Sequence, residues 1–169
     1  MMRITLLAIL YFIPFFMHAQ ELRSLKFKDL ENEIAHSKDS LMIINYWATW
    51  CKPCIEELPY FEKVHADYSS QKVKVILVNL DFNSKVESVT IPFITRKNLK
   101  SNLYHLEDTD PNEWINKVDP SWSGAIPATA MYINGKKVFF IEGEMKEQQL
   151  IWEVEKLLEE KSKNELHEN

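Results

Sequence analysis

The 169-residue sequence predicts an α/β fold in which helices cover both faces of a mixed central sheet. Two near-continuous apolar runs, residues 41–47 and 73–80, are typical of strands buried on both faces. Apolar residues recur at helical spacing between them, so this strand–helix–strand unit is expected to form a right-handed parallel crossover. Nearer the C-terminus, Asn134-Gly135 separates two further apolar runs and predicts an antiparallel hairpin, because both residues tolerate the positive φ of its turn.

The chain before the first apolar run predicts a short strand and a short helix. Leu25 and Phe27 alternate as in a strand, and after Asp29 the residues Leu30 and Ile34 fall at i and i+4. The helix between the two buried runs has an apolar face made of Ile55, Leu58, Phe61, Val64 and Tyr68.

The middle of the chain gives weaker signals. Residues 86–96 predict a helix interrupted by Pro92, and residues 99–106 predict a strand. The segment Asp110-Pro111-Asn112-Glu113 has the order of a helix start, with a capping residue, then proline, then glutamate. A last helix is expected from the apolar stripe of Leu150, Ile151, Val154, Leu157 and Leu158.

Composition and charge exclude several classes of function. The formal net charge is −5 and the pI is about 5.6, so no basic surface is expected for nucleic acid. Three glycines are too few for a Walker loop or a dinucleotide-binding fingerprint. Two cysteines are too few for a disulfide framework or a four-thiolate zinc site, but they stand close together in Cys51-Lys52-Pro53-Cys54.

Residues 1–19 have the order of a secretory signal peptide, with Arg3, an apolar run and then Ala19 at the expected cleavage position. The apolar run is short for a membrane span, which favours cleavage. Met17 is large for its place, so an uncleaved membrane anchor is the alternative, and only that anchor would attach the protein to a membrane. The protein is therefore expected to be exported to a periplasmic or other extracytoplasmic space, where disulfides persist.

The cysteine pair has the spacing of a redox-active dithiol. Cys51 falls where a strand stops and a helix begins, and the free N–H groups and helix dipole at that point favour a thiolate. Lys52 adds a nearby positive charge, and Pro53 costs little in a first helical turn. Cys54 lies one turn later on the same face, within reach of a mixed disulfide at Cys51. Cys51 is thus the candidate nucleophile and Cys54 the candidate resolving thiol.

Other roles for the pair are disfavoured but stay open. A structural disulfide across so small a loop would constrain the unfolded chain little. A metal site needs more ligands, and only His65, on the same predicted helix, can approach the thiols. A peroxidase is disfavoured because neither Arg23 nor Arg96 belongs to the cysteine motif. We therefore predict no metal, and no cofactor other than the Cys51–Cys54 disulfide itself.

Three features of the sequence resemble the thioredoxin-fold superfamily. They are the segment Asn45-Tyr46-Trp47-Ala48-Thr49-Trp50-Cys51-Lys52-Pro53-Cys54, the proline Pro59, and the segment Ala125-Ile126-Pro127-Ala128-Thr129. Within that superfamily, the sequence is most similar to the exported TlpA/ResA/DsbE-like thiol-disulfide oxidoreductases of bacteria. The resemblance covers residues 24–161, the expected thioredoxin-like domain, and leaves residues 162–169 as a polar tail.

The resemblance implies roles for several residues around the cysteines. Ile126-Pro127 is expected to be a cis peptide bond beside the disulfide, and its loop is expected to pair with an extended substrate. Trp50 is expected to shield the disulfide and contact substrate, with core packing as the alternative. Lys52 and Pro53 would tune the redox potential, and Pro59 would kink the helix, as in the family.

Two departures from thioredoxin itself are informative. Asn45 stands where thioredoxins carry a buried aspartate, so another group must accept the proton of Cys54. Glu57, three residues past Cys54, is the candidate acid/base, because the TlpA/ResA branch often has a glutamate there. The alternative is that Glu56 and Glu57 are both solvated carboxylates of the first turns.

The chain between Leu80 and Ile126 is longer than a minimal thioredoxin needs, and it fits the helix–strand–helix insertion of the exported branch, placed before the cis-proline strand. Its residues Trp114 and Trp122 either shape a groove for a partner or pack in the core.

The sequence therefore predicts an extracytoplasmic protein-disulfide reductase whose dithiol is regenerated by a thiol electron donor in the membrane. The resemblance implies exported cysteine-containing proteins as substrates, apocytochrome c among them. Because the residues between the cysteines do not fix the direction of electron flow, a disulfide oxidase or isomerase is the first alternative. A thiol-based copper-handling module of the same fold is the second.

Overall fold

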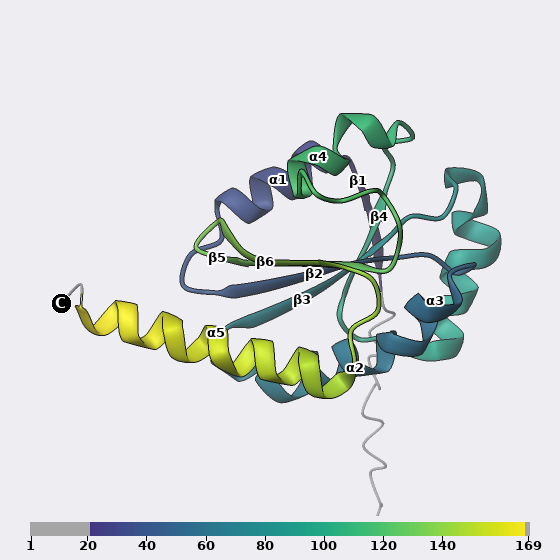
Figure 1. The fold of residues 1–169 in the computed structure, drawn as a ribbon. Coiled ribbons are helices and arrows are strands. Elements are labelled where there is room, and N and C mark those ends of the chain that lie inside the picture. The colour runs from purple at the N-terminus through teal and green to yellow at the C-terminus, as the bar shows by residue number, and fades with distance from the viewer. Residues whose placement is uncertain (1–20, 168–169) are drawn as a thin grey trace, which may run out of the picture.

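The computed structural model describes residues 21–167, in which a six-stranded mixed sheet lies between two layers of helices (Figure 1). The strands are β1 (Leu22–Leu25), β2 (Leu41–Trp47), β3 (Val73–Asn79), β4 (Asn102–Leu106), β5 (Ala128–Ile133) and β6 (Lys136–Glu142). The helices are α1 (Phe27–Ala35), α2 (Lys52–Tyr68), α3 (Ile91–Lys97), α4 (Ile115–Val118) and α5 (Glu147–His167). Short helical turns are η1 (Ser69–Gln71), η2 (Asn83–Lys85), η3 (Val86–Thr90) and η4 (Pro111–Glu113). The predicted signal peptide, residues 1–19, lies outside the described residues.

The strands lie in the order β1-β4-β3-β2-β5-β6, and their pairing confirms the predicted mixed sheet. β2 and β3, which precede and follow α2 in the sequence, pair in parallel, as expected for the predicted crossover. β5 pairs antiparallel with β2 and with β6. The hairpin turn has positive φ at Asn134 (51°) and Gly135 (76°), the conformation for which this dipeptide was expected.

Helices cover both faces of the sheet (Figure 1), and each face carries its own hydrophobic core. Leu41, Ile43 and Trp47 of β2 face the core beneath α2, α3 and α5. The alternate residues of the strand face the core beneath α1 and α4. Because side chains alternate along a strand, both faces of β2 must be apolar, which explains the unbroken apolar run.

The segment between β3 and β5 differs in detail from the prediction. The expected helix over 86–96 is divided into the π-helical turn η3 and the α-helix α3, and Pro92 lies in the first turn of α3. A proline in that turn leaves no hydrogen bond unmade, so it begins the helix instead of interrupting one. The predicted strand over 99–106 starts only at Asn102. Asp110 caps η4, as expected, by accepting a 2.9 Å hydrogen bond from the backbone N–H of Asn112.

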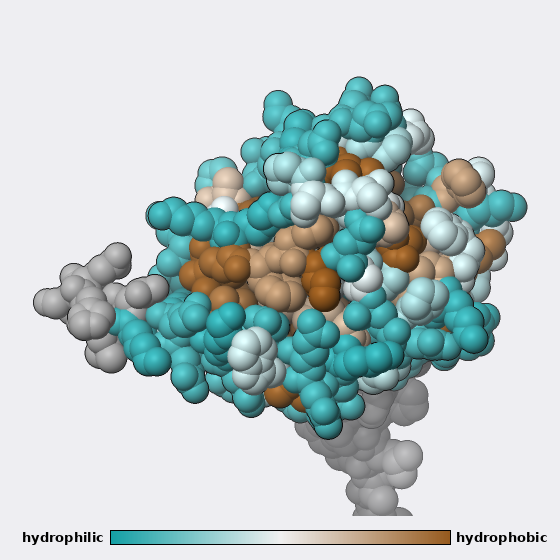
Figure 2. Space-filling view, in the orientation of Figure 1, coloured by the Kyte–Doolittle hydropathy of each residue, from teal (hydrophilic) through white to brown (hydrophobic). Residues whose placement is uncertain are grey.

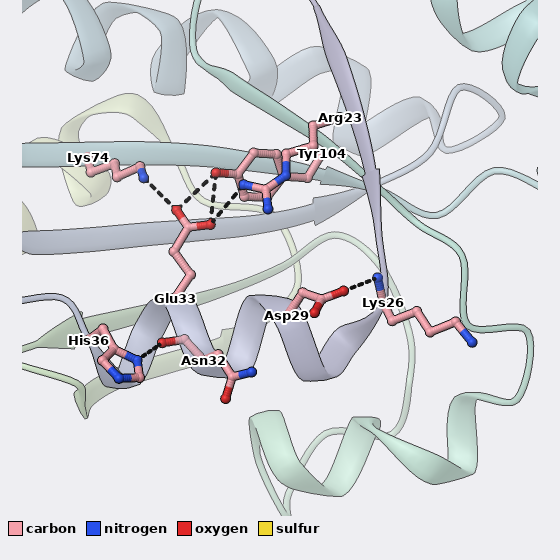
Figure 3. A network of polar contacts seen from close by, with 8 residues as sticks. All are labelled: Arg23, Lys26, Asp29, Asn32, Glu33, His36, Lys74 and Tyr104. Carbon is pink, nitrogen blue, oxygen red and sulfur yellow. Dashed lines mark hydrogen bonds and ion pairs between the residues drawn. The ribbon is translucent and has the colours of Figure 1, made fainter.

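Polar contacts attach α1 to the sheet (Figure 3). The Glu33 carboxylate of α1 accepts a hydrogen bond from the Tyr104 hydroxyl of β4 at 2.9 Å and pairs with Lys74 of β3. Arg23 of β1 lies 3.7 Å from the same carboxylate. Burial, followed by the hydrogen bond to Glu33, raises the pKa of Tyr104 to about 12, so the hydroxyl keeps its proton and donates.

The outer strand β6 leaves a band of apolar surface between hydrophilic margins (Figure 2). Phe139, Phe140 and Ile141 are half-buried there, and Val138 is exposed. A register shift pairs Met131 with Phe139 and leaves Val138 as an extra residue, which forms a bulge in this edge strand. Bulges of this kind hinder pairing between the edges of two sheets.

α2 continues through Pro59 to Tyr68, the last residue of the predicted apolar face, whereas α5 extends further than predicted. α5 passes the predicted end of the domain at Lys161 and continues to His167, so residues expected to fray as a polar tail are helical as far as that position. Among residues 21–167, no helix is both long and apolar enough to cross a membrane.

Candidate active site

The two cysteines form a disulfide at the junction between β2 and α2. Cys51 is the N-cap residue of α2, with 5% of its surface exposed, whereas Cys54 is fully buried. The backbone N–H of Cys54 donates to Cys51 Sγ across 3.3 Å. In the reduced protein, this free N–H and the helix dipole would stabilise a thiolate on Cys51, the more accessible sulfur.

The loop before β5 lies directly beside the disulfide. Its Ile126-Pro127 peptide bond is cis, as the resemblance implied. Because β5 pairs with β2, the loop reaches the end of the sheet where α2 begins, and Cys51 Sγ lies 3.6 Å from the carbonyl oxygen of Ile126.

Glu57 is completely buried one helical turn after Cys54, whereas Glu56 is exposed. Its Oε1 accepts a 2.7 Å hydrogen bond from Asn45 Nδ2, and its Oε2 accepts another of 2.7 Å from the backbone N–H of Met145. Burial raises the pKa of Glu57 from 4.5 to about 7, and the two hydrogen bonds oppose part of that rise. The structure therefore excludes the solvated alternative for Glu57 and keeps it for Glu56.

Asn45 is the partner that sequence analysis did not assign to Glu57. It lies in the middle of β2, is fully buried, and also places Nδ2 3.1 Å from Thr129 Oγ1 of the neighbouring strand β5. The available signal was a single amide in an otherwise apolar run, because a buried polar side chain must find a hydrogen-bond partner.

Trp50 has 65% of its surface exposed and does not pack in the core. It lines two hollows. One, of about 310 Å³, is also bordered by Phe82, Trp114 and Ile126, and Phe82 is 75% exposed. The other lies toward α3 and is bordered by Pro92. An exposed indole between two hollows beside the disulfide is suited to contact a polypeptide substrate.

The two tryptophans of the insertion are buried, as the core alternative predicted. The ring of Tyr46 in β2 stacks on Trp114 and packs against Trp122, with ring centroids 6.0 and 4.8 Å apart. Trp114 also forms part of the wall of the 310 Å³ hollow, so it shapes that hollow from within the core.

The residues between the cysteines are exposed. The Lys52 side chain is 87% exposed and lies 3.7 Å from Glu56 in an i,i+4 ion pair, and Pro53 is open to solvent in the first turn. Such an exposed lysine influences the thiolate only weakly. In the part of the chain that the structure describes, no group of three or more His, Cys, Asp or Glu side chains is arranged to hold a metal ion.

The sequence analysis also did not identify Asp81, a second buried carboxylate near the site. It follows β3 and accepts hydrogen bonds from Thr49 of the loop that leads to Cys51. An acidic residue directly after a buried strand is a weak signal by itself, because only the tertiary structure shows what it meets.

Comparison with known sequences identifies the family. The model of the AhpC/TSA family matches residues 13–132. The chain is 28% identical over 128 residues to the thiol-disulfide oxidoreductase ResA of Bacillus thuringiensis subsp. konkukian, which covers 72% of this chain and 68% of that protein. Several other alignments, three with ResA proteins and one with YneN, are shorter, and in these the chain spans 21% to 42% of the length of the relatives.

Solved structures confirm the thioredoxin-like fold. A thioredoxin-like protein of Porphyromonas gingivalis is 29% identical with a TM-score of 0.58, over 73% of this chain and 79% of that one. StoA of Bacillus subtilis is 26% identical with a TM-score of 0.53, over 68% of this chain and 82% of that one. The chain is thus similar to thiol-disulfide oxidoreductases of the ResA type, and it belongs to the AhpC/TSA family.

Proposed function

We propose that this protein is an extracytoplasmic thiol-disulfide oxidoreductase that reduces disulfides in exported cysteine-containing proteins. The observation that carries this proposal is the buried Glu57 one turn after the resolving cysteine, with a pKa of about 7. A carboxyl group that titrates near neutral pH can both accept and return the proton of a thiol. The names of the ResA relatives support the same class of reaction.

The reduction proceeds in two exchanges. The Cys51 thiolate attacks one sulfur of a substrate disulfide, and the other substrate sulfur leaves as a thiolate. Glu57 then accepts the proton of Cys54, whose sulfur attacks Cys51 Sγ, breaks the mixed disulfide and releases the second substrate thiolate. Two electrons pass to the substrate, and the chain is left with the Cys51–Cys54 disulfide found in the structure.

The substrate is an extended polypeptide segment in this proposal. The carbonyl oxygen of Ile126 lies beside Cys51 Sγ, so backbone pairing with the loop of Ile126 and Pro127 would place a substrate cysteine over the nucleophile. Trp50 and the 310 Å³ hollow would contact its neighbouring side chains. Apocytochrome c is one candidate of this kind, by the resemblance to the exported branch.

Regeneration requires a dithiol donor, which we propose to be a membrane thiol protein that faces the same compartment. It would attack the Cys51–Cys54 disulfide, become oxidised, and return two electrons to this chain. Residues 1–19, interpreted as a signal peptide or uncleaved anchor, support the location outside the cytoplasm.

The equilibrium reduction potential of the Cys51/Cys54 couple is the test of direction, measured by trapping free thiols across a series of dithiol buffers. A value of about −270 mV or lower, as in thioredoxin, supports the reductase. A value of about −120 mV, as in a strong oxidant, contradicts it and makes disulfide formation the activity.

Substrates can be identified by trapping. A Cys54→Ser variant keeps the nucleophile but cannot resolve a mixed disulfide, so its covalent partners should accumulate in the exported fraction. Cys51→Ser is the matched control and should capture none of them. Equal capture by both variants would contradict the assignment of Cys51 as the nucleophile.

A further inference from the structure

The loop that leads into the nucleophile is attached to a buried carboxylate. Asp81, which has only 4% of its surface exposed, follows the C-terminal end of β3. Its Oδ1 accepts hydrogen bonds from both the backbone N–H and the hydroxyl of Thr49, each at 3.0 Å. Thr49 stands two residues before Cys51, so one carboxylate oxygen fixes both the backbone and the side chain of the loop.

The second carboxylate oxygen of Asp81 also accepts two hydrogen bonds. Its Oδ2 accepts a 3.0 Å hydrogen bond from Asn79 Nδ2 and a 2.6 Å hydrogen bond from the hydroxyl of Thr90. All four donors are uncharged groups, so they hold the Asp81 carboxylate by hydrogen bonds and not by an ion pair. Hydrogen bonds to an ionised acceptor are about twice as strong as those between neutral groups.

The orientation of Asn79 is fixed from the other side. Its Oδ1 accepts the backbone N–H of Asp81 at 3.0 Å and lies 3.2 Å from Nδ1 of His105 in β4. His105 is buried, and its Nε2 lies 2.8 Å from Asn83 Oδ1. The carboxylate is therefore positioned by two strands, and it connects them to the loop that carries the nucleophile.

We propose that Asp81 is a positioning residue for thiol-disulfide exchange, which holds Thr49 so that Cys51 stays at the N-terminus of α2 and Trp50 stays between its two hollows. This inference rests on the proposed function. The loop itself contains only one turn hydrogen bond, from Cys51 N–H to the carbonyl oxygen of Ala48 at 3.1 Å. The two hydrogen bonds from Thr49 to Asp81 attach this loop to the segment that follows β3.

Position matters because the sulfur chemistry is local. The Cys54 N–H stabilises a Cys51 thiolate only while Sγ remains about 3.3 Å away, and the helix dipole acts only within the first turn. A loosened loop would therefore raise the pKa of the Cys51 thiol and slow its attack. It would also lower the reduction potential, because the thiolate of the reduced form is stabilised less.

A pair of isosteric variants tests the role of Asp81. Thr49→Val and Thr90→Val each remove one hydroxyl donor from the same carboxylate, but only Thr49 belongs to the loop of the nucleophile. The readout is the rate of alkylation of the reduced full chain by iodoacetamide as a function of pH, which gives the pKa of Cys51. Thermal unfolding of the oxidised protein measures the structural effect separately.

We expect both variants to lower the unfolding temperature, but only Thr49→Val to raise the pKa of Cys51 and to slow its alkylation at pH 7 about tenfold, the effect of one hydrogen bond to a charged group. Thr49→Ser keeps the hydroxyl and should restore the wild-type rate and pKa. Asp81→Asn, if it folds, should resemble Thr49→Val in both readouts.

Equal pKa values for Cys51 in Thr49→Val, Thr90→Val and the wild type would overturn the proposal, as would equal changes in both variants, since Asp81 would then be merely structural. Alkylation needs no physiological partner, so its result stands whether or not the chain reduces proteins. Failure of the proposed function would appear instead in the reduction potential of the wild type.

Discussion

The side-chain amide of Asn45 donates a 2.7 Å hydrogen bond to Oε1 of Glu57, so an amide in the centre of the sheet supports the buried acid beside the resolving cysteine. The donor favours the ionised form of Glu57, and burial favours the protonated form. Because these effects oppose each other, the pKa of about 7 depends on both residues. This pair gives rise to three of the predictions that follow.

Replacing Glu57 should remove the pH dependence of the resolving step. In Glu57→Gln, we expect reduction of a disulfide-bonded peptide at pH 7 to slow about a hundredfold, a common size for general acid–base catalysis. The inflection near pH 7 in the wild-type rate should disappear. Glu56→Gln is the matched control, because Glu56 is exposed on the same helix. An unchanged pH profile in Glu57→Gln would exclude the acid/base role.

Stability should fall as pH rises through a defined window. The pKa of Glu57 is raised from 4.5 to about 7, so between these values the folded chain holds a proton that the unfolded chain has released. The stabilisation is complete below pH 4.5 and is lost as pH approaches 7, by about 3 kcal/mol. Urea unfolding of the oxidised wild type and of Glu57→Gln should therefore give a difference that changes with pH in this range. A constant difference would contradict the raised pKa.

Changing Asn45 should move the titration of Glu57. Asn45→Asp removes the donor to Oε1 and places a like charge beside it, so both effects raise the pKa of Glu57. The inflection of the rate profile should shift upward by about one unit or more. Carbon-13 NMR of the labelled glutamate carboxyl checks this directly. A downward shift would show that the Asn45 hydrogen bond does not favour the carboxylate.

Trp50 and Trp114 both line the 310 Å³ hollow, but their replacement should have different effects, one on substrate binding and the other on stability. Trp50 is exposed, so Trp50→Ala should raise the KM for a protein substrate and change the free energy of unfolding by about 0.5 kcal/mol or less. Trp114 is buried against Tyr46, so Trp114→Ala should cost about 3–5 kcal/mol of stability. An unchanged KM in Trp50→Ala would argue against substrate contact at the indole, whatever Trp114→Ala shows.

The order and type of the main elements could be predicted from the sequence, because their signals are local. The apolar run of residues 41–47, the helical spacing after Cys54 and the turn dipeptide Asn134-Gly135 each specify a conformation without help from distant residues. The same holds for the cysteine pair. Because a strand ends and a helix begins at Cys51, the N–H groups of the first helical turn lie beside its sulfur. The helix boundary near Pro92 and the start of the strand at Asn102 were predicted less accurately, because packing overrides weak local patterns.

Which polar groups meet depends on the folding of the whole chain. Glu57 and Asn45 lie twelve residues apart and meet because α2 packs on the face of β2 that carries Asn45. Asp81 and Thr49 lie thirty-two residues apart and meet because parallel pairing of β2 and β3 brings the ends of these strands to one edge of the sheet. The burial that raises the pKa of Glu57 comes from the packing around α2, and the backbone N–H of Met145, which opposes part of that rise, comes from a segment 88 residues away. A sequence pattern shows which faces are apolar, but the partner of a buried charge is decided by the fold that encloses it.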